Sequence, residues 1–167
     1  MSAAQAAAAV GRTIVREHTH LINGTPTEVL PLLCPVREDD WVDGWAERCV
    51  IVQTTSGVAE RGCVFLTTDP SRVDVTWVVT RHEPDLGLVE YVWVWPGEEV
   101  VTLTIRVDAD GPGSRVRIRH TVVPLPGAHE DALDARWSAA TFDPMMAWWE
   151  RSMNHYLATG QLLRHAH

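Results

Sequence analysis

Hydrophobic and polar residues alternate along several stretches of the chain, which is the pattern of half-buried β-strands. Residues 13–22 follow this two-residue period and predict a first strand. Later short runs rich in Val, Thr and Trp predict an antiparallel meander with strands at 45–53, 62–68, 73–82, 87–95, 99–109 and 114–123. In the last of these, Arg115, Arg117 and Arg119 share one face opposite an apolar face. One side of the sheet is therefore expected to contact water.

Two helical regions flank the meander. Thr25 is a candidate N-cap, with Pro26 at the first helical position and Glu28 three residues after the cap, which predicts a short helix ending near Leu33. Residues 36–44 are too short and too broken for a long element, so a helical turn or a loop is expected there.

The second helical region follows the meander and continues to the end of the chain. Its apolar stripe, with 3.6-residue spacing, comprises Met145, Trp149, Met153, Tyr156, Gly160 and Leu163. The Asp143-Pro144 pair either kinks one long helix or begins its main segment with Asp143 as the cap. A helix from Pro144 to Arg164 would be roughly 30 Å long and would span a sheet.

Composition indicates one soluble globular domain. The 167 residues are 46% hydrophobic and 22% charged, and no shift in composition marks a second domain. We expect residues 1–12 to form a disordered or weakly helical tail and residues 13–167 a single domain. No apolar run approaches the length of a membrane span, so stable membrane insertion is not expected.

The net charge and the cysteine content exclude or disfavour several classes of partner and site. The net charge of -8 disfavours a nucleic-acid partner, and the absence of lysine excludes a lysine nucleophile. Cys34, Cys49 and Cys63 show no C-x-x-C spacing, which favours reduced thiols in a cytoplasm over disulfides or a zinc ribbon.

The order of elements and four local stretches together resemble the SRPBCC superfamily, also called START-like or Bet v 1-like. The stretches are LINGTPTEVL at 21–30, WVDGW at 41–45, GCVFLT at 62–67 and WERSMNHYL at 149–157. The resemblance covers about residues 13–164. It implies an α+β helix-grip fold, in which a curved antiparallel sheet of about seven strands wraps a long C-terminal helix, leaves an apolar cavity, and carries two short helices after the first strand.

Aromatic residues are the candidate walls of that cavity. Tyr91, Trp93 and Trp95 share one strand face, which would form a patch suited to a partner chain if it faced outward. The inward placement is favoured, because it keeps Glu90 of the opposite phase out of the core. Trp137 and Trp148, assigned to the terminal helix, are expected in the core. The predicted ligand-binding residues are Trp77, Tyr91, Trp93, Trp95, Met145, Trp149, Met153 and Tyr156.

Three histidines are the candidate catalytic residues. His18 and His20 share a strand face, and His120 lies in the apolar phase of the last strand. In the fold that the chain resembles, the first and last strands are neighbours, which would allow all three imidazoles to face one end of the cavity. A polar cluster able to act as acid or base is favoured over a zinc site, because no acidic partner is evident. The remaining alternative is that these histidines are simply hydrogen-bonded core residues or solvent-exposed residues without a function. We therefore expect no metal and no cofactor.

The four acidic residues in 38–43 are interpreted as solvated charge, since their spacing does not match a calcium-binding loop. They are Glu38, Asp39, Asp40 and Asp43.

Three classes of function remain open. The resemblance favours a carrier, sensor or accessory protein that binds a small hydrophobic molecule such as a lipid, polyketide or aromatic compound. A polyketide cyclase, aromatase or dehydratase using the histidines is the second hypothesis, and a co-chaperone-like interaction module is the third. We expect a cytoplasmic monomer or homodimer.

Overall fold

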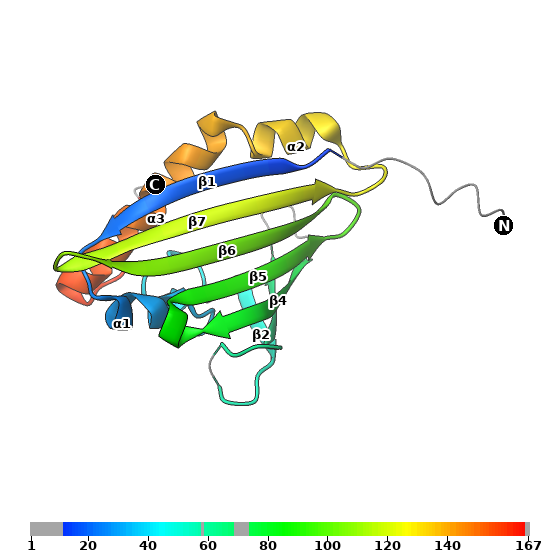
Figure 1. The fold of residues 1–167 in the computed structure, drawn as a ribbon. Helices are drawn as coiled ribbons and strands as arrows, with labels where there is room; N and C mark the ends of the chain where they lie inside the picture. The colour runs from blue at the N-terminus through cyan, green and yellow to red at the C-terminus, as the bar shows by residue number, and fades with distance from the viewer. Residues whose placement is uncertain (1–11, 58, 69–73, 166–167) are drawn as a thin grey trace.

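The structure is a computed structural model that describes residues 12–57, 59–68 and 74–165. Within these ranges, seven strands form one antiparallel sheet in the order β1-β7-β6-β5-β4-β3-β2 (Figure 1). The strands are β1 (Ile14–Ile22), β2 (Cys49–Gln53), β3 (Val64–Thr68), β4 (Asp74–Glu83), β5 (Leu88–Trp95), β6 (Glu99–Asp110) and β7 (Gly113–Pro124). The predicted strand order and the pairing of the first strand with the last are confirmed. The tail predicted for residues 1–12 lies outside the described residues, apart from Arg12.

The first predicted helix is present and changes type within its length. It consists of α1 (Pro26–Val29) followed by the 3₁₀ helix η2 (Leu30–Leu33). The carboxylate of Glu28 accepts hydrogen bonds from the backbone N–H of Thr25 at 2.8 Å and from its hydroxyl at 2.7 Å. Pro31 has no N–H to donate to the preceding turn, which explains the change from α to 3₁₀ geometry.

Residues 36–48 form turns, and the predicted strand 45–53 is therefore too long. A short 3₁₀ helix, η3 (Glu38–Asp40), lies where a helical turn was expected. The N–H groups of Arg48 and Cys49 both donate to the carbonyl of Trp45, at 3.0 and 2.8 Å. These bonds close a turn, and β2 begins only at Cys49. A third 3₁₀ helix, η4 (Pro84–Leu86), connects β4 to β5.

The C-terminal region is divided into α2 (Glu130–Arg136) and α3 (Ala139–Thr159). Ser138 caps α3, since its hydroxyl accepts from the N–H of Thr141 at 3.3 Å. Of the two alternatives for Pro144, the one with Asp143 as the cap is wrong, because Ser138 is the cap and Pro144 lies inside α3. Gly160 ends the helix in a left-handed conformation at φ 67°. Gly160 and Leu163 of the predicted stripe therefore lie beyond the helix.

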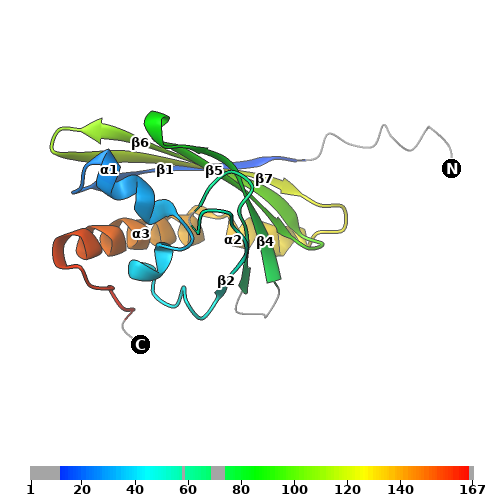
Figure 2. The same cartoon turned by 90° about the horizontal axis from the view of Figure 1, so that it is seen from below.

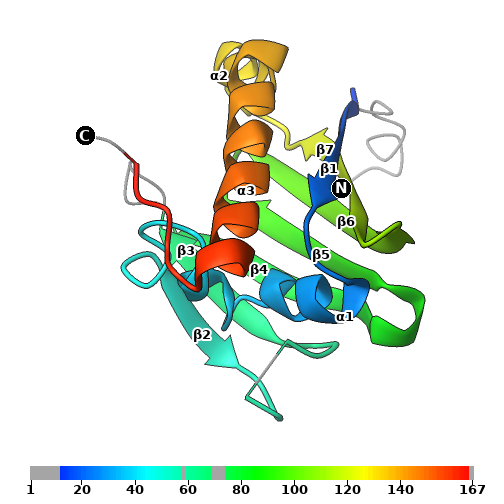
Figure 3. The same cartoon turned by 90° about the vertical axis from the view of Figure 1, so that its left-hand side faces the viewer.

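The sheet and helices form two layers. The helices lie on one side of the curved sheet, and α3 crosses its concave face (Figures 2 and 3). Apolar residues of β6 and β7 fill the space between the layers, including Val101, Leu103 and Ile118. On the opposite face, the predicted row of arginines is exposed and forms ion pairs with acidic residues of the same sheet: Arg115–Asp110, Arg117–Asp108 and Arg119–Glu17.

Candidate functional site

A cavity of about 350 Å³ lies between the sheet and α3. Inward side chains of β3 to β7 form its floor, Thr141, Met145 and Trp149 of α3 form its roof, and the turn containing Val42 and Trp45 contributes one side. Such a volume accommodates a small organic molecule.

A series of aromatic rings runs along the cavity. The strand register places Phe65 opposite Trp77, and Trp77 opposite Trp93. Ring centroids of these neighbours are 5.3 and 4.3 Å apart. Trp45 continues the series beyond Phe65 at 6.3 Å, and Trp137 continues it beyond Trp93 at 6.3 Å. The cross-strand register therefore converts separate aromatic positions in the sequence into one continuous wall.

The cavity contains six of the eight predicted ligand-binding residues in its lining: Trp77, Tyr91, Trp93, Trp95, Met145 and Trp149. Met153 is buried in the core and is not part of the lining. The hydroxyl of Tyr156 donates to Asp40 at 3.3 Å and accepts from Arg37 at 3.4 Å. The segment around η3 therefore contacts α3 at Tyr156, which lies outside the cavity lining. Trp137 lies between α2 and α3, not on the terminal helix.

Glu38 corrects the expectation that the acidic group is entirely solvated. Its half-buried side chain lines the cavity, and burial raises the pKa of its carboxyl to about 8, although the charge of Arg48 acts in the opposite direction. Asp40 and Asp43 instead form surface ion pairs, with Arg37 at 2.5 Å and with Arg164 at 3.4 Å respectively. The cavity thus contains a carboxyl group that is mostly protonated at neutral pH.

A second acidic residue in the cavity, Glu99, was missed by the sequence analysis. It is buried, and its carboxylate accepts hydrogen bonds from Arg136 at 3.0 Å and from the indole N–H of Trp137 at 2.7 Å. The guanidinium of Arg136 also lies 3.8 Å above the ring of Trp95. The available signal was the alternation in β6, because Glu99 extends the inward phase of Val101.

His120 also lines the cavity. Its ring lies 5.6 Å from that of Trp93 and 5.3 Å from those of Trp137 and Phe142. The Nδ1 atom is buried without a hydrogen-bond partner in the described part of the chain. Burial lowers the pKa of His120 to about 4, so the imidazole is neutral at neutral pH.

The other two histidines do not join His120. The register of β1 with β7 places Arg16 opposite His120 and His18 opposite Ile118. His18 and His20 have ring centroids 5.1 Å apart and approach Glu150 of α3. The structure therefore divides the predicted trio, because the edge strand faces α3 at these positions while His120 faces the cavity.

His20 is buried, and the desolvation of its ring lowers its pKa to about 4. The charge of His18 lowers this pKa further, whereas a hydrogen bond with the backbone of Met146 raises it. His20 is therefore neutral at neutral pH.

The described residues contain no helix that is both long enough and apolar enough to span a membrane. Cys34, Cys49 and Cys63, which are all described, are free thiols. Burial raises the pKa of Cys49 to about 12, which keeps this thiol protonated.

Several solved structures have the same fold as this chain. Norcoclaurine synthase from Thalictrum flavum aligns with a TM-score of 0.67 and 11% identity over 89% of this chain and 88% of that chain. Ara h 8.0201 aligns with a TM-score of 0.62 and 12% identity over 89% of this chain and 99% of that chain. DynU16, from the dynemicin biosynthetic locus, aligns with a TM-score of 0.61 and 12% identity over 88% of this chain and 48% of that chain.

These similarities confirm the predicted fold. The chain has the helix-grip fold of the Bet v 1-like proteins. It spans about half the length of DynU16. No family model matches the chain, and no curated protein matches it by sequence.

Proposed function

We propose that this protein binds a small, planar, ring-bearing hydrophobic molecule in the cavity beneath α3. The aromatic wall from Trp45 to Trp137 carries the proposal. Flat rings in series present large apolar surfaces that suit another ring system better than a flexible acyl chain, because aromatic pairs gain energy beyond simple area burial. A polyketide-derived or other polycyclic aromatic compound fits this chemistry best.

Three polar features give such a ligand an orientation. The protonated carboxyl of Glu38 is a donor toward a ligand carbonyl, and the neutral imidazole of His120 is an acceptor or a donor. Arg136, held by Glu99, supplies a fixed positive charge in the cavity lining. A few convergent polar groups in an apolar cavity are typical of small-molecule sites.

The structural neighbours support this proposal. Norcoclaurine synthase is named for an enzymatic product, and DynU16 belongs to a biosynthetic locus. The same fold is thus found in proteins associated with small-molecule synthesis. The further expectations of a cytoplasmic location, a monomer or homodimer and no nucleic-acid partner form part of the same proposal.

Fluorescence titration of the full chain tests the proposed ligand class. The probes are a planar tricyclic aromatic ketone, a sterol and palmitate, with quenching of tryptophan emission as the readout. We expect the aromatic ketone to bind most tightly. Trp77→Leu should weaken its binding at least about tenfold, since it removes the central ring of the wall while keeping an apolar side chain.

Trp148→Leu is the matched control. Trp148 is half-buried on α3 but is not part of the cavity lining, and its ring stacks on His165 at 3.7 Å. Equal affinity of the Trp77 and Trp148 variants would contradict the proposed site. Preference for palmitate would contradict the proposed ligand class.

An enzymatic role is the second candidate, and the opposed pKa shifts of Glu38 and His120 favour it. Burial keeps the carboxyl protonated and the imidazole unprotonated in the same cavity at neutral pH, which are the starting states of a general acid and a general base. This pair suits an intramolecular aldol condensation. The imidazole removes a proton beside a ketone, the resulting enolate carbon attacks a second carbonyl, and the carboxyl protonates the new alkoxide. In the dehydration, the carboxylate removes a second α-proton and the imidazolium protonates the departing hydroxyl, so water leaves and both groups return to their starting states.

Mass spectrometry of a linear aromatic polyketone incubated with the protein tests this role. Cyclisation with loss of water should be faster with the wild type than with Glu38→Gln or His120→Phe, while Asp39→Asn serves as the control. If the wild type does not accelerate the reaction, the binding function alone remains.

A further inference from the structure

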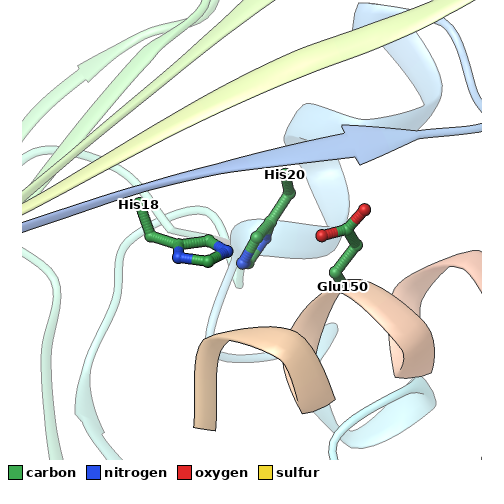
Figure 4. Close-up of side chains that lie close together, drawn as sticks. All are labelled: His18, His20 and Glu150. Carbon is green, nitrogen blue, oxygen red and sulfur yellow. The ribbon is translucent and has the colours of Figure 1, made fainter. Parts of the chain in front are cut away.

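A cluster of potential metal ligands lies outside the ligand cavity, between β1 and α3. His18 and His20 lie two residues apart on the strand, so their side chains leave it on the same face. The ring of His20 lies between the ring of His18 and the carboxylate of Glu150, which comes from α3 (Figure 4). One potential ligand atom from each of the three residues lies within 4.8 Å of the other two. None of the three belongs to the cavity lining.

One ring nitrogen of the buried His20 side chain is available to bind a metal ion. The ring is buried, and its Nε2 atom has no hydrogen-bond partner among the described residues. The backbone of Met146 also lies beside this ring, and its hydrogen-bonding effect raises the pKa of His20. Metal-binding histidines usually have a backbone or side-chain acceptor beside the ring in this way. An unpartnered buried nitrogen costs free energy that a bound cation would recover.

Glu150 is held beside the imidazoles by a backbone contact. The N–H of Leu21, the residue after His20, donates to Oε1 of Glu150 at 3.3 Å. Hydrogen bonds of this kind orient the carboxylates that bind metals. The edge strand therefore supplies two ligands and also positions the third.

The donor set selects the class of ion. Two imidazole nitrogens and one carboxylate oxygen suit Zn²⁺ and similar divalent transition metals, whereas Ca²⁺ and Mg²⁺ prefer oxygen ligands. Ligands about 2.0–2.2 Å from a tetrahedral ion lie about 3.3–3.6 Å apart, so ligand atoms separated by up to 4.8 Å reach this geometry when the side chains rotate inward. His18 and Glu150 are half-buried surface groups at the edge of the sheet, while His20 is held in the core.

We propose that His18, His20 and Glu150 form a binding site for a divalent transition metal ion of the Zn²⁺ class, with a fourth position open to water. The site revises the expectation of no metal, since the acidic partner that the sequence did not reveal comes from a helix about 130 residues away. The ion would join the edge strand to α3 and stabilise the folded state by mass action. This inference is independent of the ligand cavity.

Calorimetric titration of the full-length, untagged and chelator-treated protein with Zn²⁺ tests the proposal, and the absorption spectrum with Co²⁺ reports the coordination geometry. The wild type should bind one equivalent and show a raised melting temperature. His18→Ala and Glu150→Gln, which alter half-buried positions, should each weaken binding at least about tenfold. Glu150→His should retain binding, because imidazole is also a good ligand for Zn²⁺.

His155→Ala is the matched control, since His155 is a half-buried histidine on the same helix outside the cluster. The affinity of the His155→Ala variant for Zn²⁺ should equal that of the wild type. Circular dichroism confirms that each variant is folded before titration. The proposal is overturned if the wild type binds no stoichiometric Zn²⁺, or if His18→Ala and Glu150→Gln bind as tightly as His155→Ala.

Discussion

The carboxyl of Glu38 makes the stability of the protein depend on pH in a specific direction. Its pKa is raised to about 8 in the folded state by burial, from an ordinary value of 4.5. Between these two values the folded state keeps a proton on Glu38 that the unfolded state releases. Stability is therefore greatest below pH 4.5 as far as this group is concerned, falls as the pH rises toward 8, and levels off above it.

Replacing Glu38 with Gln removes this dependence and retains the shape of the neutral side chain. At 1.36 kcal/mol per unit, the full shift corresponds to a ceiling of about 5 kcal/mol. Glu38 is only half-buried, so contact with solvent reduces this penalty, and we expect about 1–3 kcal/mol. The advantage of Glu38→Gln over the wild type should grow by this amount between about pH 5 and pH 9.

Urea unfolding followed by tryptophan fluorescence at about pH 5, 7 and 9 measures this difference. Asp39→Asn is the control, because Asp39 is the neighbouring carboxyl and is exposed. Its stability should follow that of the wild type at every pH. Parallel profiles for Glu38→Gln and the wild type would refute the conclusion that Glu38 is protonated in the cavity.

Two further predictions concern the packing around the cavity. Trp149→Ala should lower the free energy of unfolding by about 1–3 kcal/mol, less than the roughly 3–5 kcal/mol expected for fully buried Phe142→Ala, because Trp149 lines the cavity. Thermal melts and ligand titration measure the two effects, and equal losses of stability with unchanged ligand affinity would contradict this prediction. Glu99→Ala should lower the free energy of unfolding by about 2–4 kcal/mol, because Arg136 and the Trp137 indole lose their hydrogen-bond acceptor. The control Glu17→Ala, at an exposed ion pair, should lower it by less than about 1 kcal/mol. Similar urea midpoints for the two variants would show that the Glu99 carboxylate does not stabilise the fold.

The secondary structure was largely predictable because its signals are local. The alternation of β6 and β7 follows from side chains that point to opposite faces of a strand at successive positions. The solvent-exposed face of the sheet, which carries Arg115 and Arg117, was predictable for the same reason. The end of the terminal helix was harder to predict from the sequence. The apolar stripe continues beyond Gly160, although the helix ends there because the backbone changes to a left-handed conformation.

The candidate sites depended on contacts that no local pattern contains. The sequence indicated inward aromatic residues on β5, but only the register between strands joined Phe65, Trp77 and Trp93 into one wall. The sequence placed Glu38 in a solvated acidic group. Its position in the cavity lining was not predictable, because packing against residues distant in the sequence sets the direction of a side chain in a turn.

The sequence by itself determined the order of strands and helices, the apolar and wet faces of the sheet, and a negatively charged chain without lysine. Only the tertiary structure decided which polar groups meet. It separated His120 from His18 and His20 and brought Glu150 to the latter pair from α3. The physical reason is that periodicity fixes the face on which a residue lies, whereas the register of an edge strand and the rotation of a packed helix fix its partner.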